Sequence, residues 1–410
     1  MSKAHETSML EQDPGLKLGT AGDSLARTLW IVGGAALALS ALLGLREQDA
    51  GRHFFHSYLV AYTWTLSIGI GALWWVTLQH LVNAKWSIVV RRIGEIIAAN
   101  MWLLAVAALP LVVPVAMGKA ELFRWVSPEF MHSNHALHSK AAYLNVGFFL
   151  VRFAIYFGFW GLWSQKLLAK SRSQDEGKGE RFVERFRSLS APSMILLALT
   201  LTFCSFDLLM SLDPSWQSTI FGVYYFAGAV IAIHATFIIV LAWLQKHGRM
   251  QEVVTVEHFH DLGKMLFAFV VFWAYIAFSQ FMLIWYANVP EETTFYLERI
   301  GGSWMAVSVW LIVGHFGIPF LGLLSRHVKR NRRALVFWAV WMLIAHYIDL
   351  YWLVMPNFES HAVPFSLLDI FCWVGLGATF LAAAIRRARV GHLIPMRDPR
   401  LPHSLGFENT

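Results

Sequence analysis

The chain has 410 residues, of which 57% are hydrophobic and only 14% are charged, and its mean hydropathy is +0.51. A soluble chain of this length would divide into roughly two or three domains. Here the apolar residues instead come in runs of about twenty, the length that a helix needs to cross about 30 Å of hydrocarbon. The basic residues lie mainly between these runs, so the net charge of +7 indicates anchoring at a membrane surface and argues against nucleic-acid binding.

Ten apolar runs predict ten transmembrane helices and leave almost no residues for a soluble domain. The sequence therefore predicts an all-α integral membrane protein, with tails at 1–24 and 387–410 around a membrane domain at 25–386. The predicted spans, in chain order, are 29–45, 54–82, 94–117, 141–168, 191–211, 217–244, 263–287, 302–325, 334–355 and 365–385.

The distribution of basic residues predicts the orientation. Most of the 33 lysines and arginines lie in the two tails and in the connections that follow even-numbered spans, and the positive-inside rule places these segments in the cytoplasm. Both termini are therefore expected to be cytoplasmic. The first 24 residues carry acidic side chains and no apolar core, a composition that does not fit a signal peptide.

Cysteine usage limits the redox chemistry that we expect of this chain. Its two cysteines, Cys204 and Cys372, both lie inside predicted spans, and the sequence contains no Cys-x-x-Cys-His motif. Covalent haem and an iron–sulfur cluster would each need more cysteine ligands than this. Any redox centre that the protein serves would therefore belong to a partner or be bound without a covalent bond.

An internal duplication is visible in the polar residues of the spans. Two segments, "CSFDLLMSLDP" and "HYIDLYWLVMP", each place an Asp-Leu pair seven residues before a proline. This aligns Asp207 with Asp349 and Cys204 with His346. If span nine repeats span five, the spans before them should match as well.

Three further matches follow in the same order, between spans two and six, three and seven, and four and eight. They predict two four-helix units, 54–214 and 217–356, with the first and tenth spans added outside. Because each unit has an even number of helices, the repeat is parallel, with its axis along the membrane normal. The aligned residues are Tyr58 with Tyr224, Gln79 with Gln245, Glu95 with Lys264, and Arg152 with the neighbourhood of His315.

Polar side chains on both sides of an apolar middle are candidates for a proton route, because such residues in membrane helices normally face the bundle interior or a wet cavity. The pair His346 and Asp349 is the hardest to explain as structural, since residues i and i+3 share a helix face and a charge near mid-bilayer costs roughly 2.5–3.5 kcal/mol. The candidates are Asp207, Asp349, His346, Arg152 and Gln280 on the outer side, His234 and His315 near mid-depth, and His80, Glu95 and Lys264 toward the cytoplasm.

Structural alternatives stay open for several of these residues. Arg152 could simply neutralise Asp207, and Glu95 and Lys264 could extend to the interface from near the helix ends. A lone histidine on an apolar helix, such as His234, is often a hydrogen-bonded core residue.

Three histidines in the predicted outer loop between spans three and four are a weak metal candidate. His132, His135 and His138 recur every three residues, but the first and third of such a set point to different helix faces, and no cysteine lies nearby. We therefore expect no metal in this chain.

Five segments carry a resemblance to the F subunit of bacterial alternative complex III, a quinol:electron-acceptor oxidoreductase. The likeness runs from about residue 25 to 386. The segments are "WSIVVRRIGEIIA" (86–98), "KAAYLNVGFFLVRFAIYF" (140–157), "FDLLMSLDPSWQSTIFGVYYFAG" (206–228), "HDLGKMLFAFVVFWAYIAFSQFMLIWYANVPEET" (260–293) and "HYIDLYWLVMP" (346–356).

The resemblance implies a ten-helix fold of the polysulfide-reductase membrane-subunit (NrfD-like) type, in the inner membrane of a bacterium. It implies partners: an NrfD-like sister subunit that binds quinol, an iron–sulfur subunit, c-type cytochrome subunits, small membrane subunits, phospholipids and, as a further associate, a terminal oxidase. Quinol, iron–sulfur clusters and c-type haems are then expected in those partners. The F subunit itself is expected to carry no redox centre and to offer proton half-channels.

Other functions remain compatible with the residues. The chain could bind quinone itself, since histidine and aspartate can hydrogen-bond quinone carbonyls, or it could be a purely structural anchor. A secondary transporter would also suit parallel repeats with polar residues at mid-depth. A haem b protein would need facing histidines, which His234, His315 and His346 could supply.

Overall fold

The computed structural model of this protein describes residues 13–20, 22–46, 51–133, 135–177 and 182–409. The described residues form helices joined by turns and loops, which confirms the predicted all-α fold class. Parts of the predicted N-terminal tail (1–12) and of the charged connection after span four (178–181) lie outside the described residues. Ten segments are long and apolar enough to cross a membrane: Asp23–Gly44, Arg52–Leu81, Ile88–Ala116, Val146–Asp175, Val183–Leu212, Phe221–Lys246, Val256–Ala287, Trp304–Leu324, Arg332–Asn357 and Leu367–Ala388.

Two of these segments, Ile88–Ala116 and Trp304–Leu324, are each divided into three shorter helices, and further short helices lie in the connections. The long helices are α2 (Asp23–Gly44), α3 (Arg52–Leu81), α4 (Ile88–Ala98), α5 (Met101–Ala107), α6 (Leu109–Ala116), α9 (Val146–Asp175), α10 (Phe182–Leu208), α11 (Phe221–Lys246), α12 (Val256–Ala287), α14 (Trp304–Trp310), η4 (Leu311–Gly317), α15 (Ile318–Leu324), α17 (Arg332–Val354) and α18 (Leu367–Ala388). The connecting ones are η1 (Pro14–Leu16), η2 (Arg124–Val126), α7 (Pro128–His132), α8 (His135–Ser139), η3 (Met210–Leu212), α13 (Pro290–Ile300), α16 (Arg326–Arg330), η5 (Met355–Asn357) and α19 (Leu401–Leu405).

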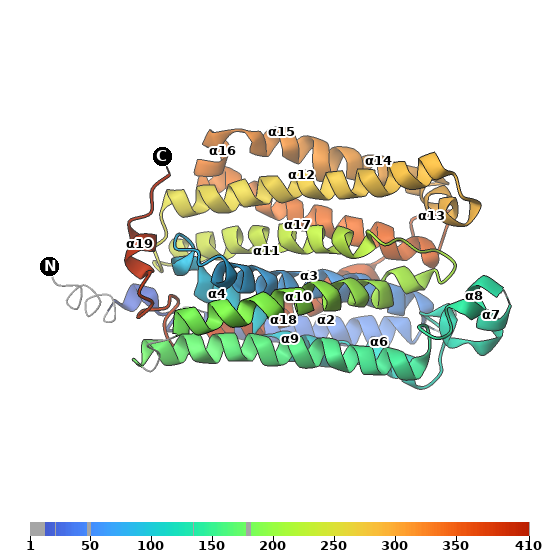
Figure 1. The fold of residues 1–410 in the computed structure, drawn as a ribbon, viewed down its shortest axis with the longest axis horizontal. Helices are drawn as coiled ribbons and strands as arrows, with labels where there is room; N and C mark the ends of the chain where they lie inside the picture. The colour runs from blue at the N-terminus through green and yellow to red at the C-terminus, as the bar shows by residue number, and fades with distance from the viewer. Residues whose placement is uncertain (1–12, 21, 47–50, 134, 178–181, 410) are drawn as a thin grey trace.

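The long helices run side by side, and η1, near the start of the described chain, lies at the same end of the bundle as α19, near its end (Figure 1). We call this the terminal end; α19 and α16 lie there, whereas α7, α8 and α13 lie at the opposite, far end (Figure 1). Each predicted span coincides with one observed segment, with the largest differences at the terminal end. There α10 and α12 begin well before 191 and 263, because helical turns rich in charged residues extend each apolar span.

Helices α3 and α11 form the centre of the bundle. Their contacts are reciprocal: α3 packs on α4, α10 and α17, and α11 packs on α12, α17 and α10. This is the pattern that the predicted repeat requires, since each central helix contacts its own unit and the last helix of the other. The two central helices approach closely at Gly71, where an added Cβ would lie only 2.4 Å from the carbonyl oxygen of Ala229; small residues permit such close helix crossings in membranes.

Helices α2 and α18 form a closely packed pair at the edge of the bundle. A Cβ at Gly33 would lie 3.0 Å from the backbone nitrogen of Thr379, and one at Gly375 would lie 2.7 Å from the Leu37 side chain. At the terminal end, the segment before α2 meets the segment after α18, where the Leu393 amide donates to the Leu16 carbonyl (2.8 Å). The two predicted outer helices therefore pair with each other.

Candidate functional site

Three buried side chains meet in the second four-helix unit. His346 and Asp349 lie one turn apart on α17, and His315 comes from η4. Their relative exposures are 1%, 1% and 0%. One ring nitrogen or carboxylate oxygen of each lies within 4.8 Å of the others, and His346 Nδ1 is 4.0 Å from Asp349 Oδ2. The sequence placed His346 and Asp349 on one helix face, and the structure adds His315 to them.

Asp349 is held by neutral hydrogen-bond donors. The Tyr224 hydroxyl of α11 donates to its Oδ1, and the Trp273 indole of α12 donates to its Oδ2 (3.1 Å). Among the residues that the structure describes, His346 is the one basic side chain within 4.0 Å of the Asp349 carboxylate. Burying a carboxylate is costly unless it is paired and hydrogen-bonded, so these contacts stabilise the site.

The two histidines of the cluster retain hydrogen-bonding capacity. His346 Nε2 lies 2.9 Å from the Ser67 hydroxyl of α3, but its Nδ1 and both ring nitrogens of His315 have no hydrogen-bond partner within the described chain. The His315 ring packs on Trp273, with centroids 3.8 Å apart. Buried nitrogens of this kind are usually satisfied by ordered water, a proton-sharing neighbour or an ion.

Local sequence builds this geometry in two ways. Gly228 of α11 lets His346 approach, because a Cβ there would lie only 2.5 Å from His346 Cε1. The Leu311–Gly317 segment is π-helical, and such widened turns occur often at functional sites. The Trp341 indole donates to the Gly314 carbonyl (2.7 Å) and supports this turn.

Arg299, a buried residue of α13, does not pair with the cluster. Arg299 donates to the Trp352 and Leu353 carbonyls at the end of α17 (3.1 and 2.9 Å). Burial lowers the pKa of Arg299 to about 10. Its role is to satisfy carbonyls at a helix C-terminus, so it fixes the far end of α17 close to Asp349.

The equivalent aspartate in the first unit has a different environment. Asp207 accepts two hydrogen bonds from the Arg152 guanidinium (2.9 and 2.7 Å) and one from the Tyr156 hydroxyl (2.8 Å). Arg152 also donates to the Tyr143 carbonyl (3.0 Å) and lies over the Tyr143 ring at 3.8 Å. The geometry is that of a buried, bidentate ion pair. It fits the alternative interpretation of the sequence, in which Arg152 simply neutralises Asp207.

At the terminal end of the first unit, Glu95 is part of a buried charge network. Arg91 and Arg92 each donate to a different Glu95 oxygen at 3.1 Å. Arg91 also pairs with Asp398 (2.8 Å), and Arg92 with Asp175 (2.9 Å). The C-terminal segment thereby packs into the bundle, so Glu95 is buried among its partners and does not extend to the surface.

The remaining predicted residues do not join one continuous chain of contacts. His80 is buried beside Phe186, and His234 binds the Val230 carbonyl of its own helix (2.8 Å). Lys264 is exposed, pairs with Asp261 and donates to Asn409. Gln280 is buried on α12, where it accepts from the Ser218 hydroxyl (3.0 Å) and contacts the Tyr296 hydroxyl (3.3 Å).

The His315, His346 and Asp349 set is the one group of potential metal ligands found among the described residues. Two imidazoles and a carboxylate suit a transition metal, although both Asp349 oxygens already accept hydrogen bonds. The cluster is closely packed: the Trp273 and His315 ring centroids are 3.8 Å apart, and a Cβ added at Gly228 would lie 2.5 Å from His346 Cε1. His132 and His138 are exposed, with ring centroids 5.3 Å apart, and the His135 side chain lies outside the described residues.

Sequence reasoning missed the residues that surround Asp349. Tyr224 was noted only for its spacing, and Ser67 and Trp273 carry no local signal because their partners are 279 and 76 residues away. It also missed Asp369 of α18, which is buried, accepts from the Ser57 hydroxyl (2.6 Å) and lies 3.8 Å from His53 Nε2. A capping sequence, Ser366 followed by Asp369, was the available signal for that residue.

No model of a known protein family matches this chain, and no curated protein is similar to it at a significant level.

Proposed function

We propose that this chain is the proton-carrying membrane subunit of a respiratory quinol-oxidising complex, with Asp349, His346 and His315 as its proton-exchanging centre. The complex is proposed from the residue pattern that resembles the F subunit of alternative complex III. The proton role is supported by one observation above all. Asp349 is buried against two histidines and neutral donors, whereas its counterpart Asp207 is paired with an arginine.

A proton-exchanging group must be able to exist in both states at accessible free energy. Asp207 forms a bidentate ion pair with Arg152, whose guanidinium does not lose its proton under ordinary conditions. Asp349 can take a proton from His346, or give one to it, without leaving a permanent cation unpaired. Of the two aspartates, Asp349 is therefore the one that we propose to exchange a proton at an accessible free energy.

The proposal places the terminal end in the cytoplasm and the far end outside, as the basic residues indicate. Asp349 lies five residues before the end of α17, or about 7.5 Å at the helical rise, so it would exchange protons with the outer side. His234, His80 and Glu95 would lie on the cytoplasmic side of the route. Quinol oxidation, iron–sulfur clusters and haems would belong to partner subunits.

Replacing Asp349 with asparagine tests the proposal in the assembled complex. Asp349→Asn keeps one oxygen that can accept from the Trp273 indole and an amide that can donate to the Tyr224 hydroxyl, but it removes the exchangeable proton. We expect a lower proton-to-electron ratio, or proton-coupled turnover reduced roughly 10²-fold, the low end of the range for general acid–base groups. Proton release and quinol turnover are measured in vesicles containing the complex.

Asp261→Asn is the matched control, since Asp261 pairs with Lys264 at the surface and is no part of the cluster. It should leave the ratio and turnover unchanged. If Asp349→Asn assembles and both quantities equal those of the wild type, the chain is a structural anchor. If quinone affinity alone falls, the quinone-binding alternative is favoured instead.

A further inference from the structure

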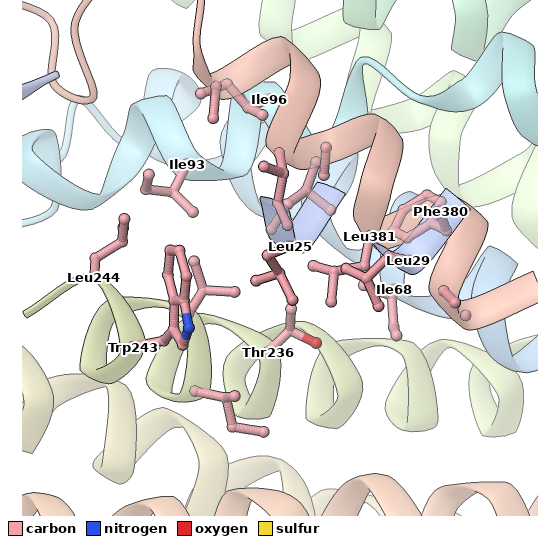
Figure 2. Close-up of a pocket in the computed structure, with 18 of the residues that line it drawn as sticks. Leu25, Leu29, Ile68, Ile93, Ile96, Thr236, Trp243, Leu244, Phe380 and Leu381 are labelled. Carbon is pink, nitrogen blue, oxygen red and sulfur yellow. The ribbon is translucent and has the colours of Figure 1, made fainter. Parts of the chain in front are cut away.

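An apolar cavity lies between the outer helix pair and the central helix α11, in the half of the bundle nearer the terminal end. Its volume is about 470 Å³, which is within the range of roughly 300–1,000 Å³ typical of ligand pockets. Figure 2 shows side chains from α2, α3, α4, α11 and α18 around it, among them Leu25, Ile68, Ile93, Trp243 and Phe380.

The lining points to a hydrocarbon chain as the occupant. On α18 the lining residues extend from Trp373 to Ala388, a length of about 22 Å at the helical rise. The hydroxyl of Thr236, the one such group in the wall, already donates to the Ala232 carbonyl (2.7 Å). The other polar side-chain atoms among the lining residues are the indole nitrogens of Trp64, Trp243 and Trp373, and an acyl chain needs only the apolar contact that surrounds them. An empty cavity of this size would also destabilise the surrounding helices.

A basic side chain lies beside the terminal end of the cavity. Leu18 and Leu393 line this end of the cavity. Beside them, Arg249 donates to the Pro14 carbonyl (2.5 Å), and its Nε is buried without a hydrogen-bond partner. Arg249 therefore provides a cationic group beside the interfacial end of the apolar cavity, the arrangement expected for a lipid with a negatively charged headgroup.

We propose that this cavity binds one acyl chain of an anionic phospholipid whose phosphate lies near Arg249. The inner end of the cavity is lined by Trp64 and Leu343, and the Trp64 indole donates to the Leu343 carbonyl (3.0 Å). The bound chain thus supports the contact between α3 and α17. The proposal does not depend on the proton role of Asp349.

Native mass spectrometry of the full-length chain in mild detergent, with defined lipids added back, tests the proposal. We expect one tightly retained phospholipid with phosphatidylglycerol preferred over phosphatidylcholine. Arg249→Gln should reduce that preference about fivefold, as expected for one basic residue near a charged headgroup. Arg326→Gln is the control, since Arg326 is an exposed basic residue at the same end, on α16, which contributes no residue to the cavity wall.

Gly377→Phe fills the cavity, because Gly377 lines it and a Cβ there meets Trp64 at an ordinary distance of 3.5 Å. This variant should retain no phospholipid. Gly34→Phe is the matched control on α2, where a Cβ has no neighbour within 4 Å, and it should retain the lipid as the wild type does. Retention by Gly377→Phe, or loss from both variants, would overturn the proposal.

A second measurement uses the unaltered protein, so it does not depend on whether the filled variant folds. Phosphatidylglycerol with a photoreactive group near the end of one acyl chain should label peptides that include Trp64, Ile68 or Phe380. Labelling confined to the outer surface of the bundle would contradict the proposal. Recovery of a quinone from the purified wild type in place of a phospholipid would equally contradict it and would favour an isoprenoid tail as the occupant.

Discussion

The two four-helix units place an aspartate at equivalent positions, but they surround it differently. In the first unit Asp207 accepts two hydrogen bonds from Arg152. In the second unit Asp349 accepts from Tyr224 and Trp273 and lies 4.0 Å from His346. The two aligned carboxylates therefore have different surroundings: one is held in an ion pair with an arginine, and the other lies among histidines and neutral hydrogen-bond donors.

The units also differ in which tyrosine donates a hydrogen bond to the aspartate. Tyr224 donates to Asp349, whereas its counterpart Tyr58 donates to the Ala107 carbonyl. In the first unit a tyrosine from a different helix, Tyr156, contacts the aspartate. The repeat therefore conserves the position of the carboxylate more closely than it conserves its partners, and the following predictions test that difference.

The largest effect is expected from removing the permanent cation of the first unit. Arg152→Gln leaves Asp207 buried with the Tyr156 hydroxyl as its remaining donor. Breaking a buried ion pair in this way costs about 3–5 kcal/mol. Thermal unfolding of the variant in detergent should show the loss, with Arg326→Gln as a neutral surface control. A variant of normal stability that has lost proton transport would contradict the structural role of Arg152.

The terminal ends of the two units offer a second contrast. Glu95 is buried in a network with Asp398, whereas its counterpart Lys264 is exposed. Burial alone would raise the pKa of Asp398, but the Arg91 and Arg400 guanidinium groups outweigh it and hold that pKa well below its usual value. Asp398→Asn should therefore destabilise the protein by about 3–5 kcal/mol at neutral pH.

The sign of the pH dependence follows from that lowered pKa. The charged form of Asp398 stabilises the fold at every pH above the ordinary aspartate value of about 3.9. This contribution falls as the pH drops through the lower folded-state pKa. Unfolding measured between pH 7 and pH 3 should show the difference between wild type and Asp398→Asn shrinking only at the acidic end. A difference that changes between pH 7 and pH 5 would implicate another group.

Converting the second unit to the chemistry of the first is the next test. His315→Arg introduces a permanent cation in the cluster with Asp349 and should hold the carboxylate charged. We expect a folded protein whose proton-coupled turnover falls roughly 10²-fold, as for Asp349→Asn. His138→Arg, on an exposed helix at the far end, is the control. Normal turnover in a well-folded His315→Arg variant would remove His315 and Asp349 from the proposed centre.

A smaller change moves His346 without altering any titratable group. The Cβ of Gly228→Ala would lie 2.5 Å from His346 Cε1, so the ring must shift, at a cost of about 1–3 kcal/mol for overpacking. The pH profile of turnover should move along with the stability. Gly158→Ala on α9, where a Cβ has open space, should be neutral or slightly stabilising. Equal behaviour of the two variants would show that His346 tolerates displacement.

The apolar runs predicted the ten membrane-spanning segments, because the length needed to cross hydrocarbon leaves a pattern in the chain itself. The one-turn spacing of His346 and Asp349 likewise placed both on one face. Their partners could not be predicted, since Tyr224, Trp273 and Ser67 are brought to the cluster by packing between helices far apart in sequence.

At the terminal end, the positions of basic residues in the sequence did not distinguish residues at the membrane surface from buried ones. Arg91 and Arg92 lie in a basic segment that indicates membrane orientation, yet both are buried and bound to Glu95. Asp398, the partner of Arg91, lies in the C-terminal segment, which shows no apolar pattern, so its return to the bundle leaves no signal in the sequence. The π-helical turn around His315 similarly depends on a tertiary contact, the Trp341 hydrogen bond to Gly314.

The smallest predicted effect tests the hydrogen bond that ties the cluster to α3, one of the two central helices. Ser67→Ala removes the partner of His346 Nε2 and should cost about 1 kcal/mol in stability. Because the hydroxyl and the imidazole share a proton, the variant should also displace the pH profile of turnover. Ser40→Ala, which removes a buried hydroxyl bonded to the Leu37 carbonyl, matches the loss of stability without contact to the cluster. A displaced profile in Ser67→Ala alone assigns Ser67 to positioning His346, and identical profiles would leave it a packing residue of α3.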